Sequence, residues 1–142
     1  MGKTMLAVML GIAFMSGCAV TPPPPRAGFT PPVPVEQRGV HSGVKQQIWW
    51  TTTLNPKCEL VGYPEFIITL SPHHGSAVSE HGEQYPGFPQ TNDRSVCNSK
   101  LVPATNLYYQ STPDFHGKDS LTMKVLTADG SIKTVHIEIE VF

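Results

Sequence analysis

The chain has 142 residues, of which 39% are hydrophobic and 15% are charged, and its formal net charge is −1 at neutral pH. This length suits one domain of ordinary size. The sequence contains no cluster of basic residues, which argues against nucleic acid as a partner.

Residues 1–17 have the order of a secretory signal peptide. Lys3 precedes an apolar run over residues 4–15, followed by the small residues Ser16 and Gly17. The run is shorter than the about 20 apolar residues that a transmembrane helix needs. It matches the hydrophobic region of a signal peptide, with small residues at the cleavage site. The order therefore predicts secretion.

Residues 15–18 (MSGC) resemble the lipobox of bacterial lipoproteins. In that family the cysteine takes a diacylglycerol on its thiol and becomes the first residue of the mature chain. The resemblance implies that Cys18 carries a lipid anchor in the cell envelope. Ala19 stands where an Asp would resemble the inner-membrane retention signal of enteric bacteria, so we expect the outer membrane, at its periplasmic or surface face. The alternative is an ordinary secretory signal with a chance cysteine.

Prolines are concentrated just after Cys18. Seven of them lie in residues 18–35, and such a run favours polyproline II and acts as a semi-rigid spacer. At about 3.1 Å per residue, the stretch from Thr21 to Val35 spans roughly 45 Å. We expect residues 18–35 to be a linker that holds a domain of residues 36–142 away from the membrane. Disordered filler is the alternative.

Two cysteines remain once Cys18 is assigned to the anchor. A secreted compartment is oxidising, so we expect Cys58 and Cys97 to form one disulfide. By the chain-entropy estimate, closing a loop of this size is worth roughly 3–4 kcal/mol. Two free thiols, or bonds to a partner, are the alternatives.

Strand signals dominate the rest of the chain, and no convincing amphipathic helix is present. Runs of β-branched and aromatic residues between turn residues predict strands at 44–53, 65–70, 107–110, 120–127 and 132–141. The last two runs alternate apolar and polar residues with a period of two, and an Asp129-Gly130 turn joins them as a hairpin. Short strands at regular spacing predict an all-β sandwich.

Residues 108–122 (YYQSTPDFHGKDSLT) resemble the Y-x-P-x-x-x-F-x-G-x-D-x-F/L-x-Y motif of bacterial immunoglobulin-like and cadherin-like domains. In that family a strand, an Asp-Gly turn and a final alternating strand follow the motif, as they do here. The resemblance implies an immunoglobulin-like β-sandwich in which Tyr109, Phe115, Gly117 and Asp119 have structural roles. Phe115 would plug the base of the sandwich, Gly117 would allow a tight turn, and Asp119 would accept backbone hydrogen bonds from a loop.

Four aromatic residues are candidates for a binding surface: Trp49, Trp50, Tyr85 and Phe88. The two tryptophans are adjacent in a predicted strand, where neighbouring side chains face opposite sides. One ring fits the core, and the other is a candidate contact for a partner protein or a glycan. Tyr85 and Phe88 lie in a predicted loop over residues 79–100, and cover of the outer tryptophan by this loop is the alternative.

His73, His74 and His81, together with Glu80 and Glu83, form the one cluster that resembles a metal site. Their spacing fits no known structural site, so a polar turn is the preferred interpretation, and we expect no metal or cofactor.

No Ser–His–Asp pattern, pair of catalytic carboxylates or glycine-rich phosphate loop stands out, so we expect a protein that is not an enzyme. The sequence predicts a lipid-anchored envelope protein whose immunoglobulin-like module binds a periplasmic or surface protein. A glycan- or peptidoglycan-binding module is the first alternative. A metal-binding periplasmic protein that uses His73, His74 and His81 is the second.

Overall fold

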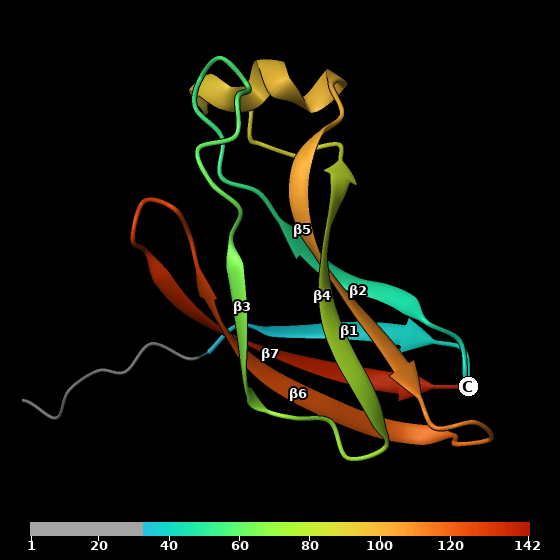
Figure 1. Ribbon diagram of the computed structural model, residues 1–142. Coiled ribbons are helices and arrows are strands. Elements are labelled where there is room, and N and C mark those ends of the chain that lie inside the picture. Colours follow the sequence, from blue (N-terminus) through green and yellow to red (C-terminus); the bar gives the residue numbers. More distant parts are fainter. Residues whose placement is uncertain (1–32) are drawn as a thin grey trace, which may run out of the picture. The chain divides into compact units, whose positions relative to one another are not determined.

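The computed structural model describes residues 33–142, which contain seven β-strands and one short 3-10 helix (Figure 1). The elements in chain order are β1 (Val35–Val40), β2 (Gln46–Thr51), β3 (Glu65–Leu70), β4 (Gly75–Gln84), η1 (Asp93–Ser99), β5 (Val102–Ser111), β6 (Gly117–Leu126) and β7 (Ile132–Val141). The predicted signal peptide, Cys18 and all but the last three residues of the predicted linker lie outside the described residues. None of the helices in residues 33–142 combines the length and apolar character that crossing a membrane requires.

The strands form two sheets. One sheet has the order β1-β7-β6-β3, and the other has the order β2-β5-β4. β1 pairs with β7 in parallel, and every other pair is antiparallel. The inner faces of the two sheets share one hydrophobic core, so the prediction of an all-β sandwich is confirmed.

The core follows from the period-two pattern of the two last strands. Alternate residues of β7 are buried, and so are Leu121, Met123 and Val125 of β6. Leu107 and Tyr109 of β5 meet them from the other sheet. Burying one such large side chain contributes roughly 1.5–3 kcal/mol, so this cluster is the main source of the stability of the sandwich.

The hairpin between β6 and β7 also follows from its sequence. The amide of Gly130 donates to the carbonyl of Thr127, whose own amide donates to the carbonyl of Ser131. Gly130 has φ of +83°, a conformation that glycine adopts without strain. The turn therefore needs a glycine at this position, as the Asp-Gly pair predicts.

A bulge in β2 changes the expected placement of the tryptophans. The register of β2 against β5 shifts between Gln47 and Trp49, so Ile48 is the extra residue of a bulge. Ile48 is buried, and Trp49 also packs against the core. The carbonyl of Ile48 accepts a hydrogen bond of 2.6 Å from Nε of Arg38, which ties β1 to β2 and closes this side of the sandwich.

Several parts of the chain differ from the sequence prediction. β5 covers residues 102–111, whereas a strand was predicted only at 107–110. β1 begins at Val35, one residue inside the predicted linker, because it pairs with β7. Residues 79–84, predicted as part of a loop, belong to β4, which pairs with β5 along its whole length. Residues 93–99 form η1, although no helix was expected there. β4 is polar and mostly exposed, so its pairing partner, rather than an apolar pattern, defines it as a strand.

Candidate binding surface

Two long connections meet at one end of the sandwich, shown at the top of Figure 1. Residues 52–64 join β2 to β3, and residues 85–101 join β4 to β5 and contain η1. A disulfide between Cys58 and Cys97 links them, with the two Cα atoms 5.5 Å apart, so the predicted disulfide is confirmed. These two connections are called the disulfide lobe below.

The disulfide lobe has a small hydrophobic core of its own. Leu54, Cys97 and Val102 are buried, and Cys58 and Phe88 pack against them. This cluster is separate from the core between the sheets. The lobe is therefore a packed structure rather than two loose loops.

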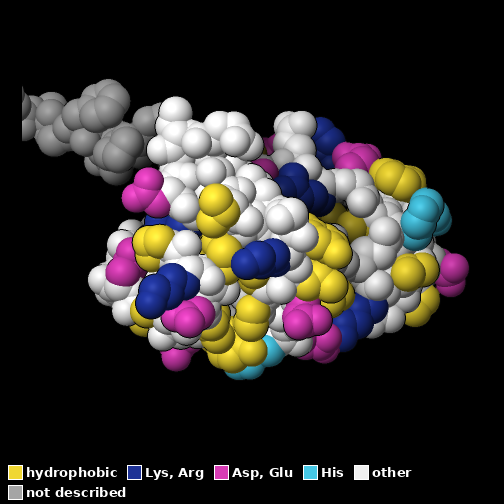
Figure 2. Space-filling model, turned by 90° about the horizontal axis from the view of Figure 1, so that it is seen from above, with side chains coloured by type: hydrophobic (Ala, Val, Ile, Leu, Met, Phe, Trp, Pro, Cys, Tyr) yellow, Lys and Arg dark blue, Asp and Glu magenta, His cyan; other side chains and the backbone are white. Residues whose placement is uncertain are grey.

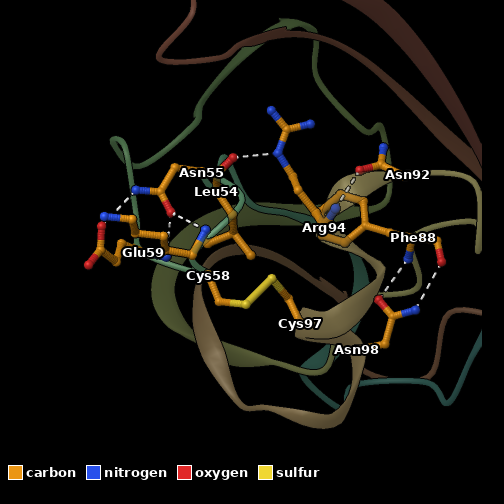
Figure 3. The surroundings of a disulfide bond; sticks show 10 residues. Leu54, Asn55, Cys58, Glu59, Phe88, Asn92, Arg94, Cys97 and Asn98 are labelled. Carbon is orange, nitrogen blue, oxygen red and sulfur yellow. Dashed lines mark hydrogen bonds between the residues drawn. A yellow bond between two sulfur atoms is a disulfide. The ribbon is translucent and has the colours of Figure 1, made fainter.

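Hydrogen bonds to Asn55 shape the first connection (Figure 3). Its side-chain oxygen accepts from the amides of Lys57, at 2.9 Å, and Glu59, at 3.0 Å, and its Nδ2 donates to the carboxylate of Glu59. The turn that these bonds hold contains Cys58 at φ of +68°, in the left-handed region that few residues adopt. The bonds from Asn55 and the disulfide thus hold the backbone at Cys58 in a conformation that it would otherwise disfavour.

Three further polar side chains shape the second connection and join it to the first. Asn92 caps η1 by accepting from the amide of Arg94, and Asn98 exchanges two bonds of 2.9 Å with the backbone of Phe88. Nε of Arg94 donates to the carbonyl of Leu54 over 2.6 Å. Figure 3 shows these bonds around the disulfide, and together they fix the two connections as one unit.

The lobe exposes apolar side chains although its own core is filled. Five of them are at least 40% exposed: Val61 (57%), Tyr63 (40%), Tyr85 (59%), Val96 (63%) and Leu101 (52%). Figure 2 views the molecule from this end and shows hydrophobic side chains interspersed with both basic and acidic ones. The ring of Tyr63 is already oriented, since it stacks on His81 with centroids 3.7 Å apart. An apolar surface on a rigid frame can bind a partner at a low entropic cost.

The four aromatic residues singled out in the sequence do not form one surface. Trp49 packs against the core, and its ring centroid lies 5.3 Å from that of Phe66. Phe88 packs against the small hydrophobic core of the lobe. Trp50 lies in β2, opposite Asn106 of β5, and is partly buried. Tyr85 is exposed in the lobe. Of the four, Tyr85 therefore has the clearest place in a binding surface.

The residues of the F-x-G-x-D motif lie at the opposite end of the sandwich, around Asp119. This buried carboxylate accepts from the amides of His73 and His74, each at 2.9 Å, and from that of Ser120. The hydroxyl of buried Tyr109 donates to it over 2.9 Å. The arrangement is a buried polar network that fixes the connection between β3 and β4.

The environment of Asp119 changes two pKa values. Burial by itself would raise the pKa of Asp119, but the backbone amides and the Tyr109 hydroxyl outweigh it and hold this pKa below the ordinary value. Burial raises the pKa of Tyr109 far above its ordinary value. The hydrogen bond to Asp119 and the negative charge of Asp119 raise it further. Asp119 is therefore ionised at neutral pH, and Tyr109 is a stable donor to it.

Phe115 and Gly117 complete this end of the molecule. Phe115 packs against the core from the edge, and the ring of His74 stacks on it with centroids 4.1 Å apart. Gly117 has φ of +127°, which only glycine adopts readily.

The structure does not bring His73, His74 and His81 together. His73 and His74 lie in the connection before β4, whereas His81 lies within β4. Seven residues separate His74 from His81, which corresponds to about 23 Å along an extended strand. Within residues 33–142 no group of three or more His, Cys, Asp or Glu side chains is placed to hold a metal ion. A groove of about 690 Å³ beside His73 and His74 is lined by both cationic and anionic side chains, among them Lys118 and Glu138.

Comparison with known proteins leaves the chain without an assigned family. No family model matches the sequence, and no curated protein matches it. Among solved structures, the solution structure of amebosin is similar over 79% of this chain and 100% of that chain, with 8% sequence identity and a TM-score of 0.37. A likeness at this level supports no conclusion about fold or function.

Proposed function

We propose that the chain is a cell-envelope lipoprotein whose immunoglobulin-like sandwich presents the disulfide lobe to a partner protein, without catalysing a reaction. The observation that carries the proposal is the group of exposed apolar side chains on a lobe that a disulfide and its own core hold rigid.

The order of the strands supports the immunoglobulin-like assignment. In constant-type immunoglobulin domains, strands B, E and D are neighbours in one sheet, and G, F and C are neighbours in the other. The order β2-β5-β4 matches the first set, and β7-β6-β3 matches the second. β1 takes the place beside the last strand. The Cys58–Cys97 bond joins two connections at one end, whereas the disulfide of antibody domains crosses the core between the sheets.

The N-terminal sequence supports the anchor. Residues 15–18 carry the lipobox resemblance, and the proline-rich linker leads to β1. Two or three acyl chains on Cys18 would hold the protein at the membrane, since each buried CH₂ contributes about 0.8 kcal/mol. The disulfide agrees with this location, because disulfides persist in oxidising compartments such as the periplasm.

A few large side chains account for most of the energy of a typical protein interface, and aromatic residues are enriched among them. In the lobe, Tyr63 and Tyr85 are such residues, and Val61, Val96 and Leu101 are further exposed apolar side chains on the same two disulfide-linked connections. Basic and acidic side chains, among them Lys57 and Asp93, accompany them. Exposed aromatic and aliphatic side chains accompanied by charged ones are typical of the composition of a protein–protein interface.

Site-specific photocrosslinking in cells tests the proposal. A benzophenone side chain is placed at Val96 in the lobe, and a matched control is placed at Val44, which is 50% exposed and lies at the other end of β2. We expect a discrete protein adduct from position 96 and none from position 44. Equal adducts at both positions, or none at position 96, would argue against the lobe. An adduct that lysozyme digestion releases would favour the glycan alternative.

A further inference from the structure

The outer face of the sheet β2-β5-β4 carries aromatic and amide side chains in two neighbouring rows. Residues directly opposite each other in antiparallel strands share a face of the sheet. The two rows across these three strands (Figure 1) are Gln47, Tyr108 and Val78, and Trp50, Asn106 and Glu80. Leu107, which lies between the two β5 members of these rows, belongs to the core, so the rows face away from the core.

The bulge at Ile48 brings Gln47 and Trp50 to this face together. In a regular strand, two residues that are three positions apart point to opposite faces. The extra residue changes this alternation, so Gln47 and Trp50 both lie opposite outward-facing residues of β5. Bulges often re-aim a side chain beside a functional site. A hollow of about 250 Å³ opens here, and both Gln47 and Trp50 line it.

Three amide side chains on this face form a network that leaves donors unused. Nε2 of Gln84 donates to Oε1 of Gln47 and to Oδ1 of Asn106, each over 2.9 Å. Asn106 is only 3% exposed, and within residues 33–142 its Nδ2 donates to no other group, although this atom still reaches the surface. Gly82 leaves room for it, since a Cβ at this position would lie 2.5 Å from Nδ2. A buried amide with an unused donor is costly, and a ligand that accepts from it removes this cost.

The two rows carry almost no charge and little aliphatic surface. Glu80 is their one charged residue, and it forms an ion pair with Lys45. The ammonium group of Lys45 also lies 4.7 Å from the centre of the Tyr108 ring, which it holds in place. Val78 is the one aliphatic side chain of the two rows. The face therefore offers no excess charge to an ionic polymer and little apolar area to a protein.

We propose that this face, centred on Trp50 and Asn106, binds a neutral glycan chain. An indole has an apolar ring face, on which the C–H groups of a sugar can pack, and an N–H donor at its edge. A side-chain amide offers donors and an acceptor next to each other, which suits sugar hydroxyls because each of them both donates and accepts.

The shape of the face favours a chain over a small molecule. The hollow beside Trp50, at about 250 Å³, is smaller than the roughly 300–1,000 Å³ of pockets that enclose a small ligand. A glycan would therefore place one ring at the hollow and continue across the rows. None of the exposed apolar side chains of the disulfide lobe belongs to these rows, so this site is separate from the proposed protein contact.

Isothermal titration calorimetry on the purified full chain tests the proposal. The detergent is lauryldimethylamine oxide, which has no sugar headgroup. The probes are cellotetraose, maltotetraose and chitotetraose, which are neutral, and a hyaluronan tetrasaccharide, which is anionic. We expect at least one neutral probe to bind with a Kd below about 1 mM and the anionic probe to bind more weakly.

Variants on the face and in the lobe locate the site. Trp50→Ala should weaken binding of that probe at least about tenfold, and Trp50→Phe, which keeps a ring, should weaken it less. Gln47→Ala, at an exposed position, should weaken it about fivefold through the loss of a hydrogen bond. Tyr85→Ala is the matched control, because Tyr85 is an exposed aromatic residue of the lobe, and it should leave binding unchanged. An intact Cys58–Cys97 bond and an unchanged circular dichroism spectrum verify the fold of each variant.

Three results would overturn the proposal: no neutral probe that binds below about 1 mM, binding that folded Trp50→Ala and Gln47→Ala both leave intact, or tighter binding of the hyaluronan probe than of every neutral one. The photocrosslink from position 96 should persist in Trp50→Ala, so the proposed protein contact and the glycan site stand or fall separately.

Discussion

Replacing both cysteines of the disulfide with alanine should weaken the domain and loosen the lobe. The bond closes a loop with a sequence separation of 39 residues. The chain-entropy relation then gives about 13 cal/mol/K, or about 4 kcal/mol at 25 °C, for its effect on the unfolded chain. Domains of this size have a total stability of about 5–15 kcal/mol, so this is a large share. The core between the sheets contains neither Cys58 nor Cys97, so the sandwich should still fold.

Urea unfolding followed by tryptophan fluorescence measures the loss. At a slope of about 1–3 kcal/mol/M, a loss of 4 kcal/mol lowers the midpoint by roughly 1.3–4 M. Hydrogen exchange should show faster exchange in residues 53–61 and 92–100 and unchanged protection in β5 and β7. Cys18→Ser is the control and should leave the midpoint unchanged. A loss below about 1 kcal/mol, with the lobe still protected, would mean that packing and hydrogen bonds hold the lobe without the disulfide.

Three further predictions concern other parts of the chain. Asp119→Ala should destabilise the domain by about 3–5 kcal/mol in urea unfolding, because it removes the acceptor of three amides and leaves the Tyr109 hydroxyl with only a long bond of 3.5 Å to the carbonyl of His74. Since folding lowers the pKa of Asp119, its contribution is complete above the ordinary value of about 3.9 and disappears as the pH falls through the lowered value. Acid titration of Asp119→Asn should lack this part of the loss, and an identical acid profile would refute the assignment. Gly75→Ala should lower the melting temperature, because its Cβ would collide with the carbonyl oxygen of Gln110 and lie 2.7 Å from the Tyr109 ring. Gly87→Ala should not, because the space around Gly87 is open. Equal effects at the two glycines would contradict the close packing around Gly75. In fractionated cells, Cys18→Ser should move the protein from the membrane to the soluble fraction, and continued membrane association would count against the lipid anchor.

The parts of the fold that the sequence predicts are those in which local pattern and long-range packing agree. β6 and β7 each have one apolar face and one polar face. The turn between them has the conformation that an Asp-Gly pair favours. β3 lies at the predicted residues because a run rich in β-branched and aromatic residues, Phe66 to Thr69, stands between Pro64 and Pro72. In these segments a window of about ten residues contains all the information that is needed.

The parts that the sequence does not predict depend on contacts between distant segments. β4 has no apolar face, and it is a strand because β5 supplies ten consecutive pairing partners. β1 follows a run of prolines and is a strand because β7 lies beside it. The bulge at Ile48, which turns Trp49 toward the core, comes from the register of β2 against β5. No local pattern contains these interactions.

For the same reason, only a part of the candidate surface could be recognised from the sequence. Counting cysteines was enough to predict the Cys58–Cys97 bond, since only two remain beside Cys18. The exposed residues Val61, Val96 and Leu101 have no periodic pattern, and reasoning from aromatic residues alone missed them. Their proximity in sequence to the paired cysteines is the signal that could have identified them.

In the proposed function, the disulfide lobe is held in one conformation and binds a partner protein in that conformation. The most direct test compares the yield of the crosslinked adduct from position 96 in the natural background and in the variant with both Cys58 and Cys97 replaced by alanine. We predict a discrete protein adduct in the natural background and at least a tenfold loss of it in the variant, about 1.4 kcal/mol or more in binding free energy. A yield that is the same in both backgrounds, at equal protein levels, would contradict the proposal that binding depends on the rigid lobe.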